Sequence, residues 1–169
     1  MDTIKSSITD IFCSLRYFFK RLIRVIQYLP IIWKNEDWDH SYIFDLLSYK
    51  LGRVEKCLKN DPYHQNAKRY ARQVQVCRIL LERLIADNYC EYEKKKHDEK
   101  WGELKHKDGK RYKAGVELIF YRDKCQTEEE KTLETEESKR IWKKEEELRK
   151  RDLESFCRIF NKHCESWWT

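Results

Sequence analysis

The chain has 169 residues, and its 36 lysines and arginines exceed its 30 aspartates and glutamates by only six charges. Four glycines and two prolines, with 14% aromatic and 39% charged residues, predict long helices that bury aromatic faces and expose charged ones. The length fits one domain, and so small a net charge gives only weak support for nucleic-acid binding. The seven cysteines are an odd number without C-x-x-C pairs, which indicates reduced thiols in a cytosolic protein.

Residues 1–30 predict an amphipathic N-terminal helix. Its apolar residues recur at intervals of three and four: Ile8, Ile11, Phe12, Leu15, Phe18, Phe19, Leu22 and Ile26. Arg16, Lys20 and Arg24 follow the opposite stripe, a pattern shared by ordinary surface helices and by helices on anionic membranes. We expect the apolar stripe to pack in the core and Pro30 to end the helix, and the frequent cations argue against a membrane span.

Two further helices are predicted to form an antiparallel central pair. The first follows Asp37 or Asp39 as its N-cap and ends at the Asn60-Asp61-Pro62 turn. The second begins near Gln65, and the short connection favours an antiparallel arrangement. The sequence leaves open whether this helix continues past Asn88 as far as Gly102.

The remainder of the chain is predicted to hold a loop, a short helix and a long helix. Glycines and lysines over residues 104–115 indicate an irregular loop, and the apolar run 116–121 favours a short helix because a lone strand would have no partner. Thr127 and Glu130 fit a capping box that starts a long C-terminal helix over residues 127–168. The expected fold is therefore an all-α bundle of four to five helices in a single domain, residues 1–169.

No motif in the chain indicates a catalytic residue, a metal site or a cofactor. Phosphate-binding glycine loops, G-x-S-x-G and H-E-x-x-H are absent. His97 and Asp98 are adjacent, but neighbours on a helix point about 100° apart and so do not form a dyad. We expect a non-enzymatic protein without a cofactor.

Cations alternate with flat aromatic rings in several segments, a pattern that suits phosphates together with stacked bases. The candidate ligand-binding residues are Lys96, His97, Lys100, Trp101, Arg69, Arg72, Arg111, Tyr112, Trp167 and Trp168. A solvated loop, ion pairs between helices and packing of the terminal indoles against the bundle are the alternative interpretations of the same residues.

Three segments resemble uncharacterised proteins encoded by tailed bacteriophages. They are WDHSYIFDLLSYKLGRVEKCL, CRILLERLIADNYCEYEKKKHDEKWG and FNKHCESWW, which carry a W-D-x-x-Y helix start, an H-D-x-K-W-G segment and a terminal Trp-Trp. The resemblance covers about residues 33–168. It implies a small helical protein in the cytoplasm of an infected bacterium, where some phage proteins act as sponges that sequester the nucleotide signal of a host defence system.

These observations lead to one functional expectation and one alternative. The first is an oligomeric counter-defence sponge that holds a small anionic nucleotide-derived ligand without cleaving it. The alternative is a phage accessory protein that binds nucleic acid or a host protein through a basic aromatic surface. Neither expectation involves a membrane as partner.

Overall fold

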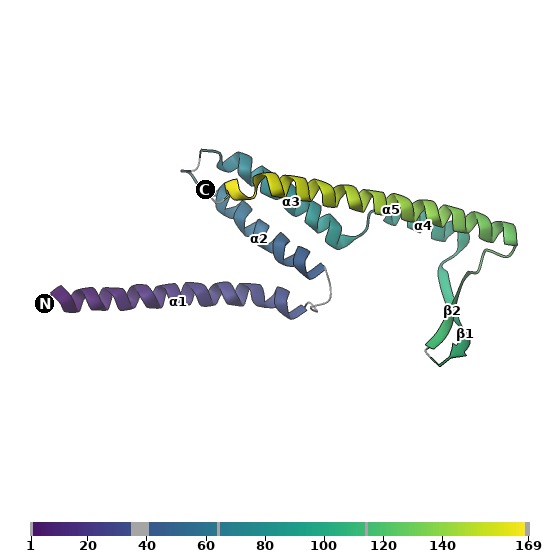
Figure 1. Ribbon diagram of the computed structural model, residues 1–169, viewed down its shortest axis with the longest axis horizontal. Helices are drawn as coiled ribbons and strands as arrows, with labels where there is room; N and C mark the ends of the chain where they lie inside the picture. The colour runs from purple at the N-terminus through teal and green to yellow at the C-terminus, as the bar shows by residue number, and fades with distance from the viewer. Residues whose placement is uncertain (1, 35–40, 64, 114, 168–169) are drawn as a thin grey trace.

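The computed structural model describes residues 2–34, 41–63, 65–113 and 115–167, with side chains from Cys13 onward. The described elements are, in chain order, α1 (Asp2–Lys34), α2 (Ser41–Lys59), α3 (Ala67–Ala86), α4 (Glu91–Trp101), β1 (Leu104–Tyr112), β2 (Gly115–Arg122), α5 (Glu128–His163) and the short 3-10 helix η1 (Glu165–Trp167). The molecule is elongated, and α1 lies apart from the other helices along most of its length (Figure 1). The β1–β2 hairpin extends from the N-terminal end of α5. The fold is thus mostly helical, but the all-α prediction omitted a hairpin.

The core lies where α2 and α3 pack against the C-terminal half of α5 and against η1. Its buried residues are Leu51, Val54, Leu58, Ala71, Val74, Cys77, Leu81, Leu84, Phe156 and Trp167. Along α2 and α3 they recur at intervals of three and four, so each of these helices contributes one apolar stripe, whereas α5 contributes Phe156 and η1 contributes Trp167. The connection between α2 and α3 is short and the two helices run in opposite directions, as the sequence indicated (Figure 1).

Helix α3 ends at Ala86, and α4 is a separate helix. Asp87 adopts a left-handed conformation with φ 49°, and its amide donates to the Arg83 carbonyl. A left-handed residue at this position closes a helix and redirects the chain. The charged stretch after Asn88 therefore packs as α4 beside α5.

The segment predicted as a loop and a short helix is instead an antiparallel hairpin. Register pairs run from Leu104 opposite Arg122 to Tyr112 opposite Gly115, with an irregularity between Asp108 and Arg111. The prediction of a short helix was wrong because residues 104–112 supply the partner strand that seemed to be missing. The β-branched and aromatic residues of 116–121 favour strands once a partner exists.

Helix α5 begins with the predicted capping box. Thr127 Oγ1 accepts the Glu130 amide at 3.2 Å, and the Glu130 carboxylate accepts the Thr127 amide at 2.9 Å. These bonds satisfy amides that a helix start otherwise leaves unpaired. The long C-terminal helix is confirmed.

Helix α1 differs from its prediction in two respects. It continues through Pro30 to Lys34, since solvent can satisfy the carbonyl that the proline leaves without a donor at this exposed position. Its apolar stripe also lies outside the core: Leu15, Phe18 and Ile26 are 49%, 59% and 57% exposed. The residues expected to cap the following helix, Asp37 and Asp39, lie outside the described part of the chain.

Candidate functional site

The segment around His97 docks α4 against α5. His97 and Trp101 are both buried, on the face of α4 that meets α5. The Trp101 indole Nε1 donates to Glu137 Oε2 at 2.7 Å, and the Lys100 ammonium lies 4.4 Å from the centroid of the Trp101 ring. The indole therefore serves as an anchor between two helices, with only 8% of the residue exposed.

Arg122, at the end of β2, joins the hairpin to both helices. Its side chain is 8% exposed and donates to Asp98 Oδ1 at 2.6 Å, to Glu134 Oε1 at 2.6 Å and to the carbonyl of Gly102. Burial lowers the pKa of this guanidinium, but the bonds to Asp98 and Glu134 outweigh burial and raise the pKa. Arg122 was not among the candidate residues predicted from the sequence, where only its position at the end of an apolar run distinguishes it.

Lysines of α4 form ion pairs with acidic residues of α5. Lys94 pairs with Glu145 at 2.7 Å, Lys100 pairs with Glu137 at 2.5 Å, and Lys96 lies 4.7 Å from the centroid of the Tyr92 ring. Acidic side chains of α5 thus neutralise two of the four α4 lysines, Lys94 and Lys100, in the segment that the sequence predicted as a phosphate site.

The other candidate residues lie elsewhere. Arg69 and Arg72 are exposed on α3, and Arg111 and Tyr112 lie at the end of β1 next to the turn. Trp167 is 3% exposed in the core, where its Nε1 donates to Gln73 Oε1 at 3.2 Å. Trp168 lies outside the described residues, and the structure does not bring the other nine together into one pocket.

The hairpin gathers cations and rings on an exposed ribbon. On one face Lys107 lies 5.7 Å from the centroid of the Tyr121 ring, and on the other the His106 and Phe120 ring centroids are 6.2 Å apart. Both faces are solvent-exposed, which is unusual because a two-stranded ribbon gains little stability by itself. We call this region the hairpin surface, and its exposed members are Lys107, Lys110, Arg111, Tyr112, Lys113, Phe120 and Tyr121.

The charges of the hairpin surface are mostly free. Lys105, at its base, pairs with Asp123. Within the described part of the chain no ion pair involves the four cations nearer the tip, Lys107, Lys110, Arg111 and Lys113. The hairpin carries six lysines and arginines against two acidic residues, Asp108 and Glu117, so the hairpin surface is a positive region of the chain.

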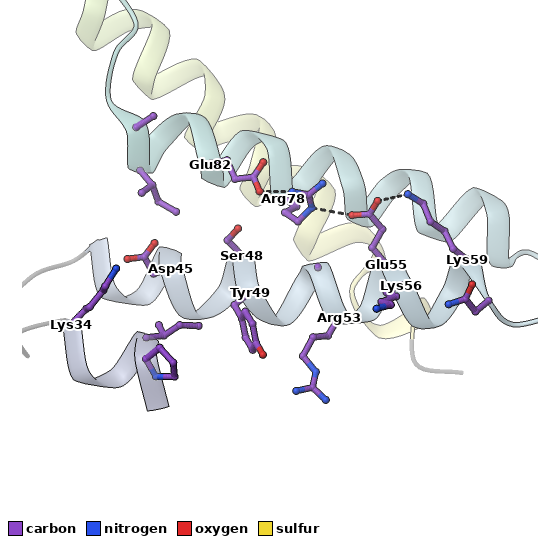
Figure 2. A pocket seen from close by; sticks show the side chains of 16 residues that line it. Lys34, Asp45, Ser48, Tyr49, Arg53, Glu55, Lys56, Lys59, Arg78 and Glu82 are labelled. Atoms are coloured by element: carbon purple, nitrogen blue, oxygen red, sulfur yellow. Dashed lines mark hydrogen bonds and ion pairs between the residues drawn. The ribbon is translucent and has the colours of Figure 1, made fainter. Parts of the chain in front are cut away.

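A groove of about 1230 Å³ lies between the end of α1, α2 and α3 (Figure 2). One wall carries a chain of ion pairs in which Arg78 bridges Glu82 and Glu55, and Lys59 pairs with Glu55 at 2.6 Å. Burial raises the pKa of Glu55, but hydrogen bonds from Lys59 and Arg78 outweigh it and lower the pKa. Both acidic groups on this wall are therefore neutralised by their neighbours.

The part of the groove nearer α1 is lined by aromatic and charged side chains, which include Asp45 beside the cations. Tyr49 packs edge-on against Tyr28 at 4.9 Å, and the Arg53 guanidinium lies 5.7 Å from the centroid of the Tyr28 ring. Lys34 and Lys56 also line the groove, and no ion pair joins either of them to another described residue (Figure 2). The groove has the size and some of the charge needed for a small anion.

Searches of the described residues give no group of His, Cys, Asp or Glu that could hold a metal ion and no helix long and apolar enough to cross a membrane. The chain matches no protein-family model, no curated protein and no solved structure.

Proposed function

We propose that this protein is a non-catalytic, phage-encoded accessory protein that binds nucleic acid through the hairpin surface. The observation that supports this proposal is the group of four cations, Lys107, Lys110, Arg111 and Lys113, which form no ion pair with any other described residue and lie on a ribbon exposed on both faces. Phosphate neutralisation by lysine and arginine provides most of the affinity of proteins for nucleic acids.

The shape of the ribbon also suits a nucleic acid. The major groove of duplex DNA admits a two-stranded β-ribbon. In this ribbon, Lys107 and Tyr121 lie together on one face. Exposed rings such as Tyr112 and Phe120 provide stacking platforms for the bases of a single strand. The ribbon therefore carries both kinds of group that nucleic-acid contacts require.

The hairpin is anchored at its base, which keeps its orientation fixed. Arg122 bonds to α4 and α5, and Lys124 donates to the Glu99 carbonyl at 2.6 Å. Gly102, with φ 85°, lets the chain turn from α4 into β1. A ribbon held in this way presents its tip without a large loss of conformational freedom on binding.

The test is fluorescence anisotropy of the full chain with labelled duplex and single-stranded DNA of about 20 nucleotides, titrated between about 50 and 200 mM salt. Replacement of Lys110 and Arg111 by Gln should weaken binding and lower the slope of log affinity against log salt by about 1.8, or about 0.9 for each lost phosphate contact. The matched control is Arg158→Gln with Lys162→Gln, two exposed cations at the other end of α5. Equal losses in the two variants would contradict the role of the hairpin surface.

Sequestration of a small nucleotide remains a second candidate, supported by the groove. Lys34 and Lys56 could hold phosphates there, and Tyr49 also lines the groove. This function predicts that one mononucleotide or cyclic dinucleotide at about 100 times its dissociation constant stabilises the chain by about 2.7 kcal/mol in thermal unfolding. It also predicts that Lys56→Gln removes this stabilisation, whereas Lys110→Gln with Arg111→Gln leaves it intact. Affinity that increases with the length of the nucleic-acid strand would instead support binding through the hairpin surface.

A further inference from the structure

Helix α1 has a broad apolar stripe that points away from the rest of the molecule. The stripe comprises Leu15, Phe18, Phe19, Leu22, Ile26, Leu29 and Trp33, which recur at intervals of three and four and are all more than 40% exposed. Seven large side chains aligned along one helix form a contiguous apolar surface, and such surfaces mark interaction sites in soluble proteins.

Contact with α2 uses the opposite side of α1. Of the described side chains of this helix, only Tyr28 and Ile31 are half-buried. Tyr28 packs against Tyr49, and Gln27 accepts a hydrogen bond from Arg53 at 2.5 Å. Tyr28 and Ile31 continue the stripe of Arg16, Lys20 and Arg24, so the helix is attached through its polar side and its apolar stripe stays free.

The charge of α1 indicates which kind of binding partner its apolar stripe contacts. From Ile11 to Lys34 the sequence contains no aspartate or glutamate, and its cations are Arg16, Lys20, Arg21, Arg24 and Lys34. Two copies packed through their stripes would leave these cations on the outer side of the pair without acidic partners. An anionic surface would instead pair with them.

The composition of the stripe also favours a lipid surface. Aromatic and leucine side chains on one side with lysine and arginine on the other are characteristic of helices that lie in the plane of a membrane interface. The 33 residues of α1 span about 50 Å at 1.5 Å each, so the helix can lie along a bilayer without crossing it. The stripe is also wider than the narrow seam that a two-helix coiled coil buries.

We propose that α1 is a membrane-surface anchor that docks this protein on anionic lipid bilayers. The apolar stripe inserts among the acyl chains near the headgroups, and the flanking cations contact lipid phosphates. The rest of the molecule is attached through the polar side of α1 and stays on the aqueous side, with the hairpin surface free.

The test is flotation of the full chain with phosphatidylcholine vesicles and with vesicles that also contain phosphatidylglycerol. The chain should float with the anionic vesicles, and Phe18→Gln with Leu22→Gln should weaken vesicle partitioning by about 100-fold, about tenfold for each apolar side chain removed. Arg16→Gln with Lys20→Gln should weaken it by about fivefold for each charge removed.

A matched control separates the stripe from other exposed apolar groups. Leu118→Gln with Phe120→Gln removes the same two residue types from the hairpin and should leave flotation unchanged. The proposal is overturned if the unmodified chain does not float, or if the hairpin variant loses flotation as fully as the α1 variant. A dimer in sedimentation that Phe18→Gln with Leu22→Gln dissociates, without vesicle binding, would assign the stripe to a second copy.

Discussion

Glu55 is the buried carboxylate on which the ion pairs of the groove converge. The residue is 6% exposed, and its two oxygens accept bonds from Lys59 at 2.6 Å and from the Arg78 Nε at 2.9 Å. An unpaired carboxylate at such a position would lose its hydration without compensation. Lys59 and Arg78 keep Glu55 ionised and thereby join α2 to α3 at the edge of the core.

This arrangement predicts a dependence of stability on pH. Because the pKa of Glu55 in the folded chain lies below the ordinary value of 4.5, its contribution is present above that value and is lost as pH falls through the lowered pKa. At neutral pH, Glu55→Gln should reduce the free energy of unfolding by about 1.5–3 kcal/mol, the value of hydrogen bonds to a charged group. In urea unfolding, the difference between the two proteins should shrink below pH 4.5, and a difference that stays constant down to pH 3 would contradict this account.

At the scale of single elements, α4 depends on tertiary contacts. It has only 11 residues, seven of them lysines or glutamates, and a helix this short is marginal in isolation. Trp101, His97 and the Lys94–Glu145 pair hold it against α5. The element exists because its side chains reach a neighbouring helix.

Replacement of Trp101 tests this dependence. Trp101→Ala should lower the free energy of unfolding by about 3–5 kcal/mol because it removes a buried indole together with its hydrogen bond to Glu137 Oε2. Trp142→Ala is the matched control: this indole is 68% exposed on α5, so its loss should change stability little. Chemical denaturation of both variants gives the comparison, and equal small effects would indicate that the Trp101 ring is free to contact a ligand.

The sequence predicted some elements well and others poorly, for physical reasons. Helices α2 and α3 carry clear apolar periodicity and α5 begins at the capping box of Thr127, so local pattern was sufficient for these elements. The hairpin was missed because residues 104–112 look irregular alone, so the apolar run 116–121 had no apparent partner strand. Around Trp101, composition alone indicated that cations and aromatic rings occur together. It could not show that Glu145 and Glu137 of α5 form ion pairs with Lys94 and Lys100.

At the scale of the whole molecule, burial is unevenly distributed. Residues Leu51, Val74 and Leu81 are at most 1% exposed, whereas the hairpin and the described side chains of α1 are mostly exposed. Local opening requires less free energy where few apolar contacts are lost. Different parts of the chain should therefore open independently.

Amide hydrogen exchange monitored by mass spectrometry should resolve this difference. Peptides from the centres of α2 and α3 should exchange slowest, near the rate of global unfolding, and peptides from β1, β2 and α1 should exchange fastest. Addition of nucleic acid should slow exchange in the hairpin alone, and addition of anionic vesicles should slow it in α1 alone. Hairpin amides as slow as those of α3 in the isolated protein would contradict an uncovered ribbon.

Helix α5 is continuous from Glu128 to His163, and its two halves have different neighbours: Glu134 and Glu137 face α4 and Arg122, while Asp152 and Phe156 face α3. Each residue added to or removed from a helix rotates one part against the other by about 100° and shifts it by about 1.5 Å. A single-residue deletion at Glu146 would therefore put the two sets of partners out of phase, although a substitution at the same exposed position would disturb neither. The packing of the two halves should therefore tolerate changes in the composition of this stretch far better than changes in its length.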